Sequence, residues 1–131
     1  ADIAKILKVR NILKKYQKNF IKKNKNCVLE GRDASTKILP NSDVKFFFVC
    51  SLDVAARRRF NELKKKLKKI NFNEVKRALY KRNSMDRTRS ISPLQKHRDA
   101  VLVNTTKLDK KAMVAKMSKY IERVIKLKYG N

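Results

Sequence analysis

Arginines and one aspartate alternate at helical spacing within residues 81–94. Arg82, Asp86 and Arg89 stand at positions i, i+4 and i+7, so a helix would carry all three on one face. Guanidinium forks are the side chains best matched to phosphate oxygens. Pro93 then closes the run. The spacing therefore predicts a segment that handles phosphate.

No phosphate-cradling glycine loop accompanies this segment. A P-loop needs two glycines before its Lys-Ser/Thr pair, whereas the only glycines in the sequence are Gly31 and Gly130. We therefore expect the arginines to contact a phosphate without a P-loop from this sequence.

Composition limits the class of partner. The 131 residues are about one domain or part of one, and their formal net charge of +25 favours nucleic acid, nucleotides or an anionic membrane surface. No apolar run approaches the ~18 residues of a membrane span, and no signal peptide is recognisable, so we expect a cytoplasmic protein. The sequence opens on Ala1 and enters a helical pattern directly, which leads us to expect a fragment or processed product.

The two cysteines and the other possible metal ligands form no recognisable motif. Cys27 and Cys50 lie in or beside apolar runs without CxxC spacing, which favours reduced, buried thiols over a structural disulfide. No spacing of His, Cys, Asp or Glu is typical of a metal site. His97 lacks such partners, and we expect no catalytic role for it.

Hydrophobic periodicity predicts alternating helices and strands. Apolar residues recur every three or four positions over residues 2–23, which is typical of an amphipathic helix. Short apolar runs predict strands at residues 27–30, 44–50 and 100–103. Further helices are expected from Ser51 or Asp53 to about residue 70, over 74–82 into the arginine segment, and after 104–106.

The middle run is apolar on both faces, as in strands buried inside a parallel sheet. We therefore expect an α/β fold with a mainly parallel sheet and flanking helices. Three strands are few for such a sheet, so a segment upstream is expected to be missing.

Several separated motifs resemble those of the bacterial cytidylate (CMP/dCMP) kinases. The first is Glu30-Gly31-Arg32-Asp33, followed by Thr36 and Pro40. Residues 55–59, 70–72, 82–94 and 99–103 follow in the family's order and spacing. The resemblance covers essentially the whole chain and corresponds to the C-terminal part of such a kinase. It implies a P-loop kinase fold of the nucleoside monophosphate kinase type, incomplete because the N-terminal P-loop strand is absent.

The resemblance also implies a division of the chain within one kinase domain. Residues 1–23 would be a helix from the CMP-binding side, residues 24–73 and 98–131 would belong to the core, and residues 74–97 would form a lid. The P-loop strand would lie between the strands at 27–30 and 44–50. We therefore expect the isolated chain to be marginally stable, swapped, or completed by a missing N-terminal segment or a second polypeptide.

The reaction implied is transfer of the γ-phosphoryl group of Mg-ATP to CMP or dCMP. Arg10 and Asp33 resemble the pair that recognises cytosine, and Arg32 resembles the contact to the acceptor phosphate. A carboxylate can accept from the exocyclic amine of cytosine, while an arginine can donate to its O2 or N3. The remaining implied positions are Arg82, Asp86 and Arg89 at the sugar and phosphate, and Arg87 and Arg59 toward the donor nucleotide.

This sequence also departs from the family's pattern. Ala1 stands at a usual serine, Ser35 at a usual glycine, and Asn104 at a frequent aspartate, while Asn83 and Met85 replace charged lid residues. We expect the chain alone to be inactive, with Mg²⁺ arriving bound to ATP.

Two alternatives stay open, a basic nucleic-acid-binding module that uses lysine faces and a non-catalytic kinase remnant. Lys64–Lys66, Lys68 and Lys69 are expected to form a solvated face, and so are Arg57 and Arg58.

Overall fold

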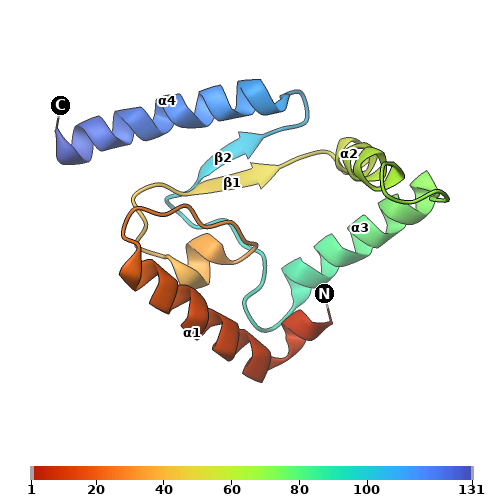
Figure 1. Cartoon of the computed structure of the whole chain (residues 1–131), viewed down its shortest axis with the longest axis horizontal. Coiled ribbons are helices and arrows are strands. Elements are labelled where there is room, and N and C mark those ends of the chain that lie inside the picture. Colours follow the sequence, from red (N-terminus) through yellow and green to blue (C-terminus); the bar gives the residue numbers. More distant parts are fainter. Residues whose placement is uncertain (1, 131) are drawn as a thin grey trace.

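The computed structural model describes residues 2–130, so the departure at Ala1 lies outside the described residues. Figure 1 shows the elements in chain order. They are η1 (Ile3–Lys5), α1 (Leu7–Lys23), η2 (Ala34–Ile38), β1 (Phe46–Val49), α2 (Leu52–Lys64), α3 (Phe72–Thr88), β2 (Val101–Asn104) and α4 (Lys110–Tyr129).

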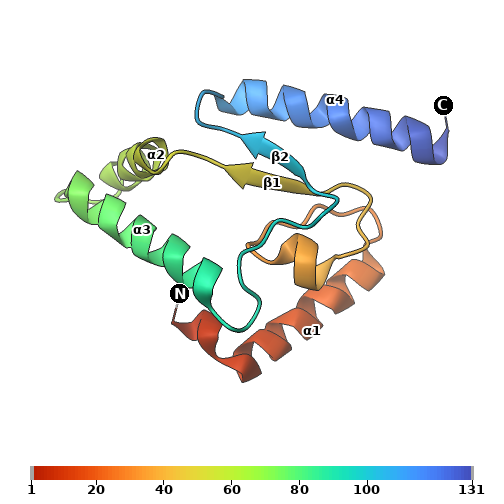
Figure 2. The same ribbon diagram turned by 180° about the vertical axis from the view of Figure 1, so that it is seen from behind.

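A short parallel sheet lies at the centre of the fold. β1 pairs with β2 in parallel, with Phe46 opposite Val101 and Val49 opposite Asn104. α4 lies on one side of this sheet, and α1, η2 and α3 lie on the other (Figures 1 and 2). Tyr120 of α4 meets Phe46 edge to face, with ring centroids 5.7 Å apart. The expected α/β class with a parallel sheet is confirmed, and the paired strands are the second and third predicted ones.

The strand predicted at residues 27–30 is wrong. The segment is irregular and unpaired among the described residues, and the side chain of Val28 is 97% exposed. A strand exists only where its backbone N–H and C=O groups find a neighbouring strand, and the described sheet consists of β1 and β2 alone. The apolar pattern was sufficient to suggest a strand but could not supply the partner.

Helix boundaries differ from the predicted ones in four places, one of which is the end of α2 at Lys64 instead of about residue 70. The first helix is broken at Ile6, whose extended backbone separates η1 from α1. α3 extends beyond the predicted 74–82 at both ends, and the Asn71 side chain caps its start by accepting from the amides of Asn73 and Glu74. α4 begins only at Lys110, where Asp109 accepts from the amide of Ala112. Ser51 caps α2 as one of the two predicted starts.

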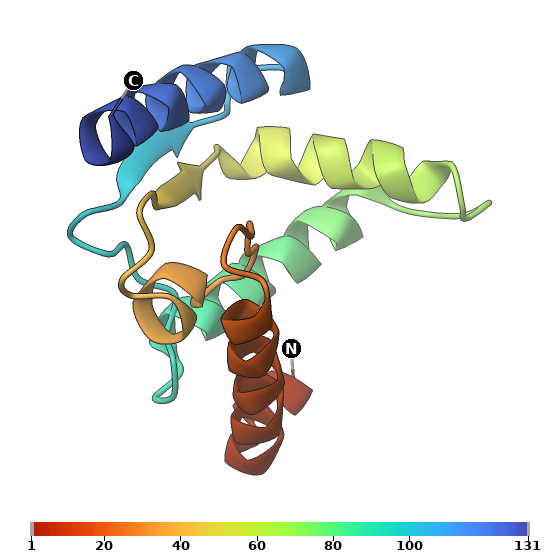
Figure 3. The ribbon, with the colours of Figure 1, turned by 60° about the vertical axis from the view of Figure 1, so that its left-hand side comes forward.

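Little of the chain is buried. The buried hydrophobic residues in the described part are Ile38, Ala56, Ala100 and Val103. The accessible surface is 10740 Å², whereas a compact monomer of 15.4 kDa exposes about 7,200 Å². α1 contains no buried residue, and the apolar side chains Leu13, Tyr16 and Phe20 are exposed on it. As Figure 3 shows, α1 projects away from the sheet. This conformation leaves an incomplete core.

The large exposed surface predicts that the isolated chain has a low free energy of unfolding and that this free energy depends only weakly on urea concentration. The denaturant m-value scales with the surface exposed on unfolding, and the unfolded chain exposes about 22,000 Å². We expect a urea m-value about three-quarters of that of a compact domain of this length, together with a low midpoint. Urea titration by circular dichroism, with light scattering to report the oligomeric state, measures both. Robust two-state unfolding of a monomer with a full-sized m-value would contradict this expectation.

Candidate functional site

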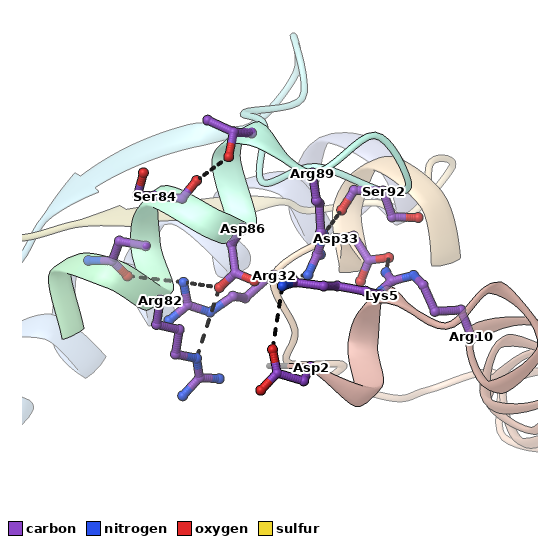
Figure 4. A network of polar contacts seen from close by, with 12 residues as sticks. Asp2, Lys5, Arg10, Arg32, Asp33, Arg82, Ser84, Asp86, Arg89 and Ser92 are labelled. Atoms are coloured by element: carbon purple, nitrogen blue, oxygen red, sulfur yellow. Dashed lines mark hydrogen bonds and ion pairs between the residues drawn. The ribbon is translucent and has the colours of Figure 1, made fainter. Parts of the chain in front are cut away.

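Arg32 and Asp33 are consecutive residues that contact two different helices. The guanidinium of Arg32 reaches α3, where its Nη1 lies 2.6 Å from Oδ2 of Asp86. The carboxylate of Asp33 accepts a hydrogen bond from Nη2 of Arg10 on α1 at 2.5 Å. The segment between the unpaired residues 27–30 and η2 therefore connects the two helices on this side of the sheet (Figure 4).

Asp86 is the acid at the centre of the arginine cluster. Its side chain is 7% exposed and accepts from Nη1 of Arg89 at 2.9 Å. Nε of Arg82 lies 3.9 Å from Oδ2, one helical turn away. We call Arg32, Arg82, Asp86 and Arg89 the Asp86 cluster. Arg82 and Arg89, which the sequence spacing grouped with Asp86, are thus joined at the same carboxylate by Arg32.

Arg89 contacts this carboxylate from just beyond the end of the helix, whereas the spacing predicted that Arg89 would lie on the helix itself. α3 ends at Thr88, and Arg89 has an extended backbone rather than a helical one. The Arg89 side chain turns back to Asp86, and its Nε donates to the carbonyl of Ser92 at 2.6 Å. Ser92 has φ of +48°, an uncommon left-handed backbone for a residue other than glycine. Arg89 therefore connects the end of α3 to a strained turn just before Pro93.

The two contacts of Arg32 on α3 differ in kind. Its Nη1 donates a hydrogen bond to Oδ1 of Asn83 at 3.0 Å. The closer approach to Asp86 is an ion pair without hydrogen-bond geometry, since Oδ2 of Asp86 is buried and has no hydrogen-bond donor among the described residues. Asp86 thus supplies charge, and Asn83 supplies the directed acceptor.

Positive charge exceeds negative charge in the cluster. Three guanidinium groups surround one carboxylate, which leaves a net charge of about +2. Partial burial lowers the pKa of Arg32; Asp86 opposes this effect, while repulsion from Arg82, Arg89 and Arg87 adds to it. An anion bound beside Arg32 would relieve that repulsion. A cavity of about 280 Å³ adjoins the cluster and is lined by Lys5, Met85, Thr88, Arg89, Ser90 and Ile91.

Arg10 and Asp33 form a second, separate ion pair. Their side chains are 16% and 17% exposed, so the pair is largely but not fully withdrawn from water. Arg10 lies on α1 and Asp33 directly precedes η2, whose first turn it begins. The structure therefore brings together the two residues that the sequence assigned to one task, and it leaves part of both accessible.

The two arginines assigned to the donor nucleotide lie outside these contacts. Arg59 pairs with Glu62 on α2 at 2.7 Å, and Arg87 is exposed in the last turn of α3. Within residues 2–130, no group of three or more His, Cys, Asp or Glu side chains could hold a metal ion.

Arg57 and Arg58 are exposed, as predicted for a solvated face, but both also make contacts that the sequence did not predict. The guanidinium of Arg57 lies 4.0 Å from the centre of the Phe72 ring. Arg58 donates to the carbonyls of Thr105 and Leu108 at 2.7 and 3.0 Å and thereby holds the turn between β2 and α4. Their acceptors and rings come from distant parts of the sequence, so local charge patterning gave no sign of them. The hydrogen bond between Asn83 and Arg32 was also not predicted, although Asn83 shares a helix turn with Arg82 and Asp86.

The sequence matches the family model for cytidylate kinase over residues 1–123. The chain belongs to the cytidylate kinase family. It is 40% identical over 124 residues to the cytidylate kinase of Thermosipho melanesiensis, a match that covers 95% of this chain and 57% of the relative. It is 41% identical to that of Carboxydothermus hydrogenoformans over 94% of this chain and 55% of the relative. It is 36% identical to that of Clostridium tetani, with 93% and 54% covered.

The family assignment confirms the resemblance found in the motifs and implies a P-loop nucleoside monophosphate kinase fold. The chain spans little more than half the length of these curated cytidylate kinases. None of the helices within residues 2–130 is both long and apolar enough to span a membrane.

Removing the central carboxylate of the Asp86 cluster should disrupt this side of the fold. Asp86→Asn leaves three arginines without a counter-charge, and breaking a buried pair from one side costs roughly 3 kcal/mol or more. We expect the variant to unfold at lower urea than the wild type, or to be unfolded without urea. Asp43→Asn is the matched control, because Asp43 is an exposed acid that contacts Lys128 and Tyr129 on α4. Equal unfolding midpoints for the two variants would contradict the central role of Asp86.

Proposed function

We propose that this chain supplies the acceptor-binding part of a cytidylate kinase, which transfers the γ-phosphoryl group of ATP to CMP or dCMP. The observation that carries the proposal is the adjacency of Arg32 and Asp33, whose side chains enter two polar clusters of different charge. A nucleoside monophosphate likewise has two chemically different ends, a base and a phosphate. One dipeptide can therefore contact both ends of a single ligand.

The Arg10–Asp33 pair has the chemistry needed to recognise cytosine. The Asp33 carboxylate can accept from the exocyclic amine, and the Arg10 guanidinium can donate to O2 or N3 of the ring. Adenine offers a different arrangement of donors and acceptors to the same two groups. Their partial exposure leaves them accessible to a base. This pair is the proposed source of base selectivity.

The Asp86 cluster has the charge needed for the phosphate end. A phosphate monoester carries about −1.5 to −2 charges at neutral pH, which matches the net positive charge of the cluster. In the proposed reaction, Arg82 and Arg89 stabilise charge on the transferring group, and Arg32 holds the acceptor phosphate. Asp86 keeps the arginines together and can accept from the sugar. The proposed roles of Arg59 and Arg87 are contacts to the donor nucleotide.

Catalysis requires a phosphate-binding loop that residues 1–131 do not provide, since their two glycines are 99 positions apart, at Gly31 and Gly130. We propose that residues 1–23, 24–73 with 98–131, and 74–97 act as helix, core and lid of one kinase domain. A segment carrying the loop would add its strand beside β1, where an edge of the two-stranded sheet is unpaired. Mg²⁺ would enter with ATP as part of the donor substrate.

Ligand selectivity tests the proposed acceptor site. We expect the wild-type chain to bind CMP at least tenfold more tightly than AMP, because base-edge hydrogen bonds discriminate by about 1–3 kcal/mol. Asp33→Ala should remove that preference while Asp43→Ala retains it. Isothermal titration calorimetry at one salt concentration gives all the affinities. Equal binding of CMP and AMP by the wild type would reject the proposal.

Complementation tests the proposed incompleteness. We expect no ATP:CMP phosphoryl transfer by this chain alone, and transfer after addition of the part of the Thermosipho melanesiensis cytidylate kinase that this chain does not match. A coupled assay for ADP measures the rate. The same mixture made with Asp33→Ala is the control and should stay inactive at CMP concentrations that saturate the wild type. Full transfer by the isolated chain would contradict the requirement for a second segment.

Nucleic-acid binding is the second candidate function, favoured by five exposed lysines at the end of α2 and in the connection to α3. They are Lys64, Lys65, Lys66, Lys68 and Lys69. Charge neutralisation of this kind gives an affinity that falls steeply with salt. If it operates, replacing the five lysines by glutamine should weaken binding to single-stranded RNA at least tenfold without changing the affinity for CMP. Fluorescence anisotropy at two salt concentrations checks this, and unchanged RNA affinity would exclude this surface.

A further inference from the structure

The guanidinium of Arg32 is anchored through one nitrogen. Its hydrogen bonding within residues 2–130 involves Nη1 alone, which donates to Oδ1 of Asn83 at 3.0 Å. The ion pair with Asp86 is also made by Nη1. The opposite edge of the guanidinium, formed by Nε and Nη2, therefore makes no hydrogen bond to the described part of the chain. Two parallel N–H groups on one edge are the arrangement that binds two oxygens of a phosphate.

Asn83 is the contact that sets the direction of this free edge. The Asp86 carboxylate attracts Arg32 without accepting a hydrogen bond from it, since Oδ2 is left without a donor. A Coulombic contact alone restrains the distance of a guanidinium better than its rotation. The directed bond to the Asn83 amide oxygen restrains the rotation. Asn83 lies on α3 one residue beyond Arg82, so a rigid helix holds the acceptor in place.

We propose that Asn83 is a positioning residue that orients Arg32 so that its Nε and Nη2 edge receives the phosphate of the acceptor nucleotide. The inference rests on the proposed function, because the ligand it assigns is the same nucleoside monophosphate. Asn83 acts through Arg32 and does not itself touch the ligand.

Asn83 is uncharged, and this also matters for its role in orienting Arg32. An amide oxygen accepts from Arg32 as a carboxylate would, but it adds no negative charge near the phosphate. With an acid at this position, the net charge of the neighbourhood would fall from about +2 to about +1. Asn83 therefore orients Arg32 while leaving the attraction for a doubly charged phosphate intact.

Three variants separate orientation from charge. Asn83→Ala removes the acceptor, Asn83→Asp keeps an acceptor and adds a charge, and Ser84→Ala is the matched control at an exposed neighbour on the same helix. The probes are CMP, cytidine and inorganic phosphate. Cytidine reports binding of the base without a phosphate, and circular dichroism verifies that each variant retains the helical content of the wild type.

We expect Asn83→Ala to weaken CMP binding about tenfold while cytidine affinity changes less than twofold. Asn83→Asp should bind CMP nearly as well as the wild type at pH 5, and increasingly worse toward pH 7.5. The phosphate gains its second negative charge near pH 6, so the added carboxylate repels it more at the higher pH. Ser84→Ala should match the wild type with all three probes.

Nuclear magnetic resonance of the Arg32 Nε–H group gives a readout that does not depend on nucleotide recognition. Inorganic phosphate should shift this signal in the wild type and in Ser84→Ala, and should fail to shift it at the same concentration in Asn83→Ala. Loss of CMP and cytidine binding in equal measure would show a merely structural role and overturn the inference. A phosphate-induced shift that is the same in Asn83→Ala and the wild type would also overturn it.

The same data distinguish this inference from the proposed function. If the wild type binds CMP and AMP equally but shows a phosphate-induced shift that depends on Asn83, cytosine recognition is rejected and the orienting role of Asn83 is retained. If the wild type prefers CMP but Asn83→Ala behaves like Ser84→Ala, the proposed function is retained and the orienting role of Asn83 is rejected.

Discussion

The fold on one side of the sheet depends on a single buried carboxylate. Asp86 is the counter-charge for three arginines that come from a loop, from α3 and from the turn after α3. Like charges repel strongly where water is partly excluded, so these arginines converge only because an anion lies among them. The same anion does not neutralise them, and a positive excess remains. The pairing of three arginines with one carboxylate therefore gives both structural stability and attraction for a phosphate.

The remainder of the chain is much less self-sufficient than this cluster. A two-stranded sheet is marginal in water unless other elements cover it, and here the exposed surface is about half as large again as that of a compact monomer. The apolar stripe of α1 is exposed rather than covered. α2, α3 and α4 nevertheless have side-chain caps, at Ser51, Asn71 and Asp109. Local structure is thus well specified, while the global core is not completed by the described residues.

The contrast between well-specified local structure and an incomplete core explains which features the sequence could predict. The start of α2 at Ser51 and the positions of β1 and β2 follow from capping and apolar patterns, which are local properties. Residues 27–30 have the same kind of pattern, but a strand also needs a neighbour, and no local pattern reports one. The hydrogen bonds of Arg58 could not be predicted for a similar reason, since its acceptors lie about 50 positions away. The motif resemblance located Arg32, Asp33 and Asp86 together, whereas the acceptor role of Asn83 became visible only from the geometry.

The adjacency of Arg32 and Asp33 has a consequence for how selectivity can change. Under the proposed function, one peptide unit fixes the position of both the group that recognises the base and the group that grips the phosphate. Any backbone shift that improves one contact must move the other. Binding strength and choice of base are then mechanically coupled traits, and neither can drift far without the other. Compensation must come from α1 or α3, whose side chains can adjust independently.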